Sequence, residues 1–440
     1  MSADRLNSAT SPAPPVSPTS PAFWRSPLRG PRLTALLGVV LLAGVTLLFV
    51  TGMLSYAAYN PNLAGGVNDQ TPDKGLLGFY LFDWPTDPAW LYRVTQGLHV
   101  TLGVALVPIL LAKLWSVIPK LFALPPARSV GHALERLSLL LLVGGALFEF
   151  VTGILNIQLE YLFPGSFYPL HFYGAWVFTG AFVAHVVLRF PRTLRALRER
   201  TDPGRGGPQR TADDDTGLVA PRPDPPTVSR RGALALVGGG SLLLLATTAG
   251  QSIGGWWRRT ALLAPHGGPD PGSGPNGFQI NKTAASRGIR PQDTGDDWRL
   301  TIEVGGPGAP PGGSGRRVRL SRTDLLKLPQ HEAALPIACV EGWSTDDQRW
   351  SGVRLRDLAA LVGLGEQPPD VLVESLQLHG AFRLAALRDN QVRDPRSLLA
   401  LRVGGEDLSP DHGYPARIIV PAAPGVLNTK WVARMTFGEW

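Results

Sequence analysis

Five long hydrophobic segments dominate the first 250 residues of the chain. They lie at roughly 33–57, 90–115, 134–157, 168–190 and 232–250. Each is close to the ~20 residues that an α-helix needs to cross a hydrocarbon core of ~30 Å. Because lipid offers no hydrogen-bond partners, only helices or closed barrels satisfy their backbone there. The pattern therefore predicts an all-α transmembrane bundle of four helices, with a fifth helix as an anchor.

The remaining residues, 256–440, show a different pattern. They are rich in Arg, Gly and Pro, and short apolar runs typical of strands lie at 298–304, 371–374 and 416–420. An amphipathic helix is expected near 354–362, among many Gly and Pro turns. This mixture predicts a separate α+β domain, so we expect a multidomain chain.

Polar segments set the other domain boundaries. Residues 1–28 are rich in Ser, Pro and Ala and too poor in apolar residues to order themselves, which predicts a disordered cytoplasmic tail. The four-helix domain then covers 33–190 and is followed by a polar cytoplasmic linker at 191–228. The fifth helix falls within 229–255.

The basic residues, which contribute to a formal net charge of +8, crowd at alternate ends of the hydrophobic segments. Arg25, Arg29 and Arg32 precede the first segment, whereas the 58–89 loop carries four aspartates against one lysine. By the positive-inside rule the N-terminus is cytoplasmic and 256–440 is extracytoplasmic, in a multi-pass protein of the plasma membrane. No aromatic-interleaved basic motif accompanies the charge, so we expect no nucleic-acid partner.

Cys339 is the only cysteine in the chain. A single cysteine excludes an intramolecular disulfide and any iron–sulfur cluster held by cysteines alone, and no Cys-x-x-Cys-His motif is present for covalent haem attachment. Any haem must therefore be held by histidine.

An arginine pair precedes the fifth hydrophobic segment, in the sequence Ser229-Arg230-Arg231. It resembles a twin-arginine export signal in an internal position, which suits a domain that receives its cofactor in the cytoplasm and crosses the membrane already folded. A positive-inside flank explains two arginines equally well, so both interpretations stay open here. No persuasive small-residue cleavage site follows Ala249, and we expect the segment to remain as an anchor.

Three segments of the C-terminal domain carry candidate chemistry. They are Ile337–Ser344 around Cys339, Trp350–Leu355 with W-x-G-x-x-L spacing, and Asp411–Trp431 with the pattern G-x-P-x-R…P…G…K-W. These segments resemble, in the same order, the sulfite oxidase family, and the Cys-Val-Glu-Gly-Trp form is similar to its bacterial periplasmic molybdopterin-dependent branch. The resemblance implies a sulfite-oxidase-like α+β fold, a molybdopterin cofactor and Cys339 as the protein ligand of molybdenum.

The residue chemistry agrees with that resemblance. A high-valent molybdenum ion with dithiolene ligands accepts a soft thiolate and deprotonates it, although a buried structural cysteine is the alternative for Cys339. The phosphate of the pterin requires fixed cations, and Arg417 and Lys430 stand on either side of a Gly/Pro loop at 421–425. Ordinary surface charge is the alternative for these two residues.

The resemblance adds further candidates around the cofactor. Glu341, two residues after Cys339, is expected close to the metal, where a carboxylate relays protons. Tyr414 is a second catalytic candidate. The remaining candidates for contact with molybdopterin are Asn281, His412 and Trp431.

His99, His171 and His185 fall within predicted transmembrane segments, where polar side chains are costly and usually functional. His171 and His185 are 14 residues apart, which places them within about 40° of one helix face and about 21 Å apart along the axis. The arrangement resembles the four-helix cytochrome b subunits of formate dehydrogenases and nickel hydrogenases, whose second and fourth helices share the outer haem. It implies haem b held by His99 and His171. A second, inner haem at His185 has no partner histidine on the first segment, with His132 as the only substitute; packed histidines without cofactor are the alternative.

Together the two halves predict a membrane oxidoreductase that transfers an oxygen atom to or from a small substrate and exchanges electrons with the quinone pool. The resemblance implies that this substrate contains sulfur. Glu149, within the third segment, is a candidate for quinone protonation. The alternative is a haem-free membrane anchor with a non-catalytic binding domain. Sulfite and sulfoxides both remain open as substrates, as do the direction of the reaction and the oligomeric state.

Overall fold

The computed structural model describes residues 28–29, 31–63, 71–72, 81–121, 129–157, 167–198, 228–264, 274–305 and 316–439. Residues 1–27 of the predicted tail and residues 199–227 of the predicted linker lie outside the described residues. The chain divides into two compact units. The first consists of Met1–Leu42, Pro108–Val143 and Ala181–Gly238, and the second of Ala43–Val107, Gly144–Gly180 and Gly239–Trp440.

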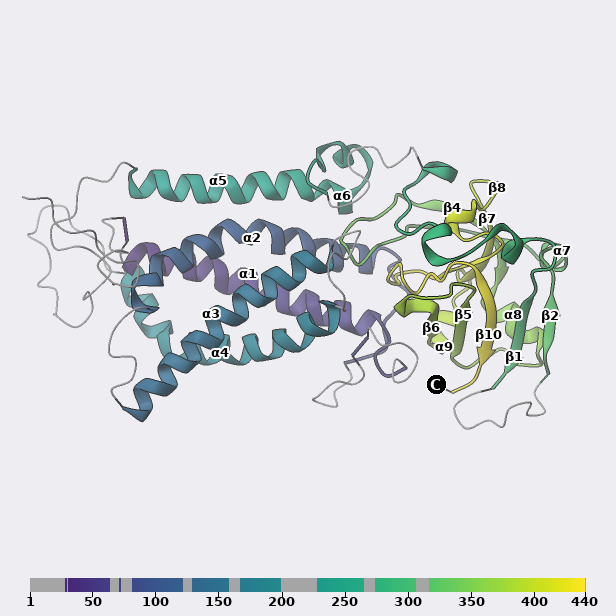
Figure 1. Ribbon diagram of the computed structural model, residues 1–440, viewed down its shortest axis with the longest axis horizontal. Helices are drawn as coiled ribbons and strands as arrows, with labels where there is room; N and C mark the ends of the chain where they lie inside the picture. The colour runs from purple at the N-terminus through teal and green to yellow at the C-terminus, as the bar shows by residue number, and fades with distance from the viewer. Residues whose placement is uncertain are drawn as a thin grey trace, which may run out of the picture. The chain divides into compact units, whose positions relative to one another are not determined.

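Five long helices form the N-terminal region (Figure 1). They are α1 (Pro31–Ala58), α2 (Leu91–Leu121), α3 (Val130–Asn156), α4 (Phe167–Arg198) and α5 (Arg230–Thr248). Pro31 is the first residue of α1, where a missing backbone N–H costs nothing. All five are long and apolar enough to cross a membrane by length and composition. The prediction of five apolar helices is therefore confirmed.

After α5 the chain forms two short helical turns, α6 (Gly250–Ile253) and η1 (Gly255–Thr260), and then enters a mixed α/β domain. Its first sheet has the strand order β2-β1-β10-β5-β6 and is antiparallel except for the parallel pair of β1 and β10. These strands are β1 (Leu300–Val304), β2 (Val318–Leu320), β5 (Val371–Ser375), β6 (Leu384–Leu387) and β10 (Val432–Phe437).

The second sheet has the order β3-β4-β7-β8, with β9 pairing β7. Its strands are β3 (His331–Leu335), β4 (Gln348–Arg354), β7 (Leu398–Val403), β8 (Glu406–Asp407) and β9 (Arg417–Ile419). Three short helices complete the domain: α7 (Arg322–Lys327), α8 (Leu355–Leu361) and α9 (Asp389–Arg393). The expected strands at 298–304, 371–374 and 416–420 correspond to β1, β5 and β9, and the expected helix to α8, so the mixed α/β prediction is confirmed.

Two apolar clusters hold this domain together. The larger one joins the first sheet to α8, whose Leu355 and Leu358 are fully buried against Val371 and Val373 of β5. The smaller one surrounds the fully buried Trp350 of β4. Burial of such side chains stabilises a domain by about 1.5–3 kcal/mol each. The clusters therefore provide a rigid support for the loops that connect the strands.

Inside the second unit, the segment before α2 packs on one of these loops. Trp84 donates its indole N–H to the carbonyl of Ala422 at 2.7 Å, and the backbone N–H of Ala422 donates to the carbonyl of Ala89 at 3.2 Å. Asn390 donates to the Trp84 carbonyl at 3.0 Å. These bonds hold the 421–425 loop, in which Ala422 has a φ of +56°, a conformation that a non-glycine residue adopts only when its surroundings impose it.

Candidate functional site

Cys339 lies in a tight turn between β3 and β4. Its backbone N–H donates to the carbonyl of Trp343 at 2.8 Å, and the N–H of Gly342 donates back to the Cys339 carbonyl at 3.1 Å. Gly342 has a φ of +90°, which favours glycine at this point of the turn. The Cys339 side chain is buried, and burial, followed by the charge of Glu341, raises the pKa of its thiol well above the ordinary value. Without a metal the thiol is therefore protonated, and a bound metal would deprotonate it.

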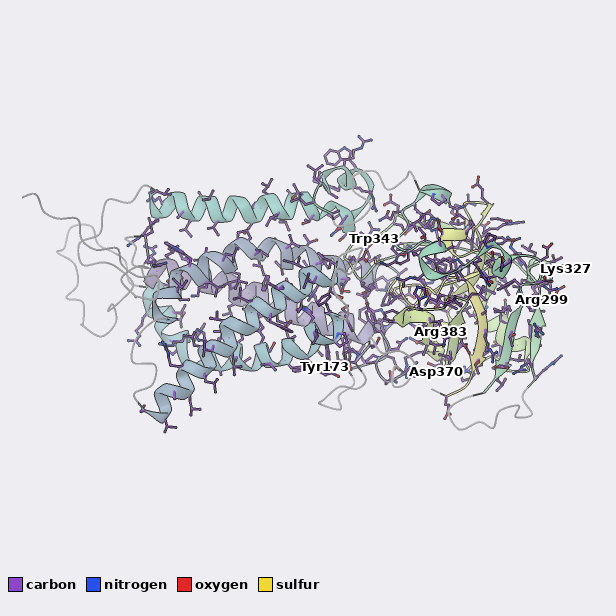
Figure 2. All side chains as sticks on the ribbon, viewed as in Figure 1. Tyr173, Arg299, Lys327, Trp343, Asp370 and Arg383 are labelled. Carbon is purple, nitrogen blue, oxygen red and sulfur yellow. The ribbon has the colours of Figure 1, made fainter. Side chains whose placement is uncertain are left out.

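Glu341 is held on the same turn by a buried hydrogen bond. The indole N–H of Trp343, labelled in Figure 2, donates to Glu341 Oε2 at 2.7 Å, and both side chains are buried. The carboxylate also contributes to the raised pKa of the Cys339 thiol, so the two groups lie close together. The structure thus brings this predicted pair together, and the proton-relay role of Glu341 stays a prediction.

The three signature segments converge around this turn. The N–H of Gly425 donates to the carbonyl of Ala338 at 2.7 Å, next to the cysteine. A Cβ atom on Gly425 would lie 3.1 Å from that oxygen, so a larger residue would force the two loops apart. The guanidinium of Arg417 lies 5.1 Å from the ring centre of Trp350. Segments that are up to 90 residues apart in the sequence therefore form one site.

Arg417 and Lys430 are buried cations, and Asp411 is the one carboxylate among the described residues whose charge acts on Lys430. Arg417 is buried and donates to the carbonyls of His412 at 3.1 Å and Asn428 at 3.2 Å; burial lowers its pKa to about 9. Lys430 Nζ donates to Asn281 Oδ1 at 3.3 Å and to two backbone carbonyls, and burial lowers its pKa to about 7, with a smaller contribution from Arg417. Neither cation forms an ion pair with a carboxylate in the described part of the chain. Buried charge of this kind requires an anionic partner.

Several buried polar atoms near these cations also have no hydrogen-bond partner among the described residues. They are Arg417 Nε, Asn428 Nδ2, Thr429 Oγ1 and both polar atoms of Gln279. Buried donors without partners are rare and point to a bound group that satisfies them. In the described residues, Cys339 belongs to no group of three or more His, Cys, Asp and Glu that could hold a metal ion. A metal here would thus take most of its ligands from a cofactor, and the donor set fits an anionic, acceptor-rich one such as molybdopterin.

The other predicted residues contribute mainly to the walls of the site. His412 is buried, stacks on Phe278 with ring centres 3.7 Å apart, and shares Nε2 with the carbonyls of Pro275 and Phe278. Burial lowers its pKa to about 3, so the ring is neutral. Trp431 donates its indole N–H to the Pro410 carbonyl at 2.7 Å. Their contacts with a cofactor stay predictions.

Tyr414, the second catalytic candidate, lies at the edge of the smaller apolar cluster. The guanidinium of Arg322 stands 5.0 Å from its ring centre, and the ring packs against the cluster around Trp350. These contacts are structural, and the predicted catalytic role of Tyr414 stays a prediction.

Sequence reasoning missed several residues beside the cysteine turn. A pocket of about 230 Å³ is lined by Arg258, Gln279 and Thr345, among others, and Thr345 directly follows the segment that carries Cys339. Arg258, which comes from η1, is buried and donates to the carbonyl of Ser344. Asn428 and Thr429 directly precede Lys430, and only this proximity in the sequence could have identified them as site residues. Nothing in the sequence pattern marked Arg258 or Gln279.

A second candidate site lies between the helices of the second unit. The rings of His99 on α2 and His171 on α4 face each other with centres 6.2 Å apart and planes at 89°. His99 Nδ1 lies 3.0 Å from Thr51 Oγ1 and 3.1 Å from the Leu48 carbonyl. His171 Nδ1 lies 3.1 Å from Thr152 Oγ1. The structure therefore brings the first two predicted haem histidines together.

The structure does not show a second pair of histidines among the described residues. His185 belongs to α4 in the first unit. His132 belongs to α3, and its side chain lies outside the described residues. The carboxylate of Glu149 lies 3.2 Å from His171 Nδ1, and its predicted role in quinone protonation stays a prediction.

Comparison with known proteins identifies the C-terminal part. Residues 287–440 match the family model described as the oxidoreductase molybdopterin binding domain. Mitochondrial sulfite oxidase of Rattus norvegicus is 33% identical over 165 residues, which cover 32% of this chain and 29% of that protein. The uncharacterized oxidoreductase YuiH of Bacillus subtilis is 34% identical over 118 residues, which cover 27% of this chain and 58% of that protein.

A solved structure, the sulfane dehydrogenase SoxCD from Paracoccus pantotrophus, aligns with 32% of this chain and 38% of that chain, with a TM-score of 0.28 and 23% identity. The chain spans less than two thirds of the length of each of these relatives. The C-terminal part is thus a molybdopterin-binding oxidoreductase domain of the sulfite oxidase type, as its motifs predicted. The resemblance of the N-terminal half to cytochrome b subunits stays a prediction.

Proposed function

Because its C-terminal part is a molybdopterin-binding oxidoreductase domain of the sulfite oxidase type, we propose that this protein is a membrane-bound enzyme that transfers an oxygen atom on a small sulfur-containing substrate. Its electrons pass to or from the quinone pool through a b-type haem. The observation that carries the proposal is the buried Cys339 turn beside two cations, Arg417 and Lys430, that have no carboxylate partner among the described residues.

Each residue of the molybdenum site has a separate role. When bound, the cofactor supplies two-electron oxygen-atom transfer. Cys339 provides the thiolate ligand, while Arg417 and Lys430 neutralise the pterin phosphate with charge-assisted hydrogen bonds. Asn281 orients Lys430 through their 3.3 Å contact. Glu341, fixed by Trp343, holds or releases the proton that accompanies the reaction at the metal.

Exposed apolar side chains support a membrane location for the helices. Leu140 is 63% exposed, Val187 68% and Leu236 76%, and they stand on three of the five long helices. Large apolar side chains exposed on helices of this length are unfavourable in water and favourable in lipid. The positive-inside pattern then puts the N-terminus in the cytoplasm and the C-terminal domain outside the plasma membrane. The arginine pair before α5 serves as the export signal for the folded domain.

His99 and His171 are the proposed haem ligands. Their ring centres are 6.2 Å apart, so the two side chains are close enough to hold one metal centre between them. Such a haem would accept and donate single electrons, which a two-electron site and a quinone pool both require.

The test is an analysis of the purified full-length protein in detergent. We expect bound molybdenum, a b-type α-band in the reduced-minus-oxidised spectrum, and reoxidation of the quinol-reduced haem by a sulfoxide or its reduction by sulfite. Protein with neither metal nor α-band would instead support a haem-free anchor with a non-catalytic binding domain.

A further inference from the structure

The helices α1 and α3 carry the same short sequence at equivalent positions. Phe49–Leu54 and Phe150–Leu155 both read Phe-Val-Thr-Gly-x-Leu, at an offset of 101 residues. The same offset relates Gly44 of α1 to Gly145 of α3. In α2 and α4, a Leu-His pair recurs with His99 and His171 at an offset of 72. The sequence motifs of α1 and α2 therefore recur, in the same order, in α3 and α4.

The contacts between the helices repeat with the same offsets. A Cβ atom on Gly44 would meet Leu106, and one on Gly145 would meet Phe178. Phe178 follows Leu106 by 72 residues, the same offset that separates His171 from His99. Glycine at these positions lets each helix approach its partner closely. The hairpins α1–α2 and α3–α4 are therefore two copies of one packed unit.

Each copy holds its histidine in the same way. His99 Nδ1 contacts Thr51 Oγ1 and the carbonyl of Leu48, three residues earlier. In the second copy, His171 contacts Thr152 Oγ1 and the backbone of Glu149, again three residues earlier.

The glycine that follows each threonine gives room to the ring. A Cβ atom on Gly52 would lie 3.2 Å from His99 Cε1, and one on Gly153 would lie 3.3 Å from His171 Cε1. These distances are too short for a side chain unless the imidazole moves. The Thr-Gly pair therefore sets both the hydrogen bond and the position of the ring.

The direction of these hydrogen bonds sets the tautomer of both rings. Thr51 donates its hydroxyl hydrogen to the Leu47 carbonyl at 2.8 Å, and Thr152 donates to the Phe148 carbonyl at 2.7 Å. Each hydroxyl oxygen is then an acceptor, so Nδ1 of each histidine carries the hydrogen and Nε2 keeps its lone pair. A hydrogen-bond acceptor at Nδ1 orients a histidine that binds metal through Nε2 and increases the basicity of that nitrogen.

We propose that Thr51 and Thr152, with Gly52 and Gly153, are duplicated positioning residues that hold His99 and His171 as a matched pair of ligands for a single metal centre. The proposal rests on the proposed function, in which that centre is a haem iron. In this proposal, His99 and His171 form a pair because the helical hairpin that carries each of them was duplicated within the chain.

The same duplication explains why only one such pair exists. In the second copy His185 follows His171 by 14 residues, and the corresponding position in the first copy is occupied by Lys113. The ammonium group of Lys113 donates to the Thr34 carbonyl at 2.6 Å, and a protonated amine has no lone pair for a metal. The inner pair of ligands is therefore broken in this chain, and one haem per chain is expected.

The surroundings of the two histidines differ at one position. Leu48 of the first copy corresponds to Glu149 of the second, whose Oε2 lies 3.2 Å from His171 Nδ1. His171 thus has an additional acceptor that His99 lacks. We expect the two threonines to act in the same direction in spite of this difference.

The test compares Thr51→Val and Thr152→Val with Thr101→Val in the full-length protein. Valine keeps the shape of threonine and removes the acceptor. Thr101 is the matched control, because it is also buried, lies on α2 two residues after His99, and has no hydrogen-bond partner in the described part of the chain. The readouts are haem per chain, the rate of haem transfer to excess apomyoglobin, and the electron paramagnetic resonance spectrum of the ferric haem.

Loss of the hydrogen-bond partner of a metal-binding histidine typically lowers metal affinity by about 10- to 100-fold. We expect each of the two variants to lose haem roughly tenfold faster or more, with a changed ferric spectrum, and Thr101→Val to match wild type. If wild type contains haem and neither variant, or only one of them, differs from it, the proposed role of the two Thr-Gly pairs is wrong and the haem proposal still stands. A wild type without haem would overturn the haem proposal and the role of the Thr-Gly pairs together.

Discussion

Replacement of Arg417 by methionine should have opposite effects on the folded protein and on cofactor binding. Burial lowers the pKa of this arginine from 12.5 to about 9, which corresponds to roughly 4–5 kcal/mol of unfavourable charge burial in the cofactor-free protein. The substitution also removes two hydrogen bonds and the contact with Trp350, worth about 1 kcal/mol each. The cofactor-free variant should therefore be more stable than wild type, by about 1–2 kcal/mol.

The same substitution should weaken binding of the cofactor. A charge-assisted hydrogen bond to an anion contributes about 1.5–3 kcal/mol, so affinity should fall roughly 10- to 150-fold. Stability is measured by urea unfolding of full-length protein from cells that cannot make the cofactor, and loading by molybdenum content from cells that can. Arg396→Met is the control, since Arg396 is paired with Asp394 and Asp87 at the surface; it should lose stability and keep molybdenum. A cofactor-free Arg417→Met protein that unfolds more easily than wild type, or one that loads fully, would refute the reasoning.

Three further predictions concern individual groups. Glu341→Gln should retain molybdenum and lose turnover about 100-fold or more, because general acid–base groups contribute 10²–10⁴-fold; full activity would exclude the proton relay. Binding of inorganic phosphate to cofactor-free protein should fall about tenfold per pH unit above pH 7, because Lys430 has a pKa lowered to about 7 and loses its charge as the pH rises, whereas Lys430→Arg should show no such decline. Haem analysis of the purified protein should give one haem per chain, and two would contradict the lost inner pair at Lys113.

The sequence predicted the elements whose signals are local. Segment length and hydrophobicity are sufficient for the helices, and the motif residues Cys339, Arg417 and Lys430 lie where a single site requires them. Strands such as β4, β7 and β10 were not predicted, because their pairing depends on residues far away in the sequence. Their role is visible only once the sheets are formed.

Side-chain roles were harder to predict than positions. His412 has the expected location, yet its ring is used to hold the segment around Phe278, which no local pattern indicates. Gln279 and Arg258 line one pocket with Thr345 only because the tertiary structure brings these segments together. The duplicated Thr-Gly pairs are visible in the sequence, but their meaning depends on the contact between helices.

The central claim is that Cys339 binds molybdenum in a molybdopterin site. It is tested most directly by molybdenum X-ray absorption spectroscopy of the full-length wild-type protein and of Cys339→Ser. Because Arg417 and Lys430 hold the cofactor independently of the cysteine, we expect the variant to retain molybdenum and to show one fewer sulfur neighbour around it. An unchanged sulfur shell in a molybdenum-loaded Cys339→Ser protein would contradict the account.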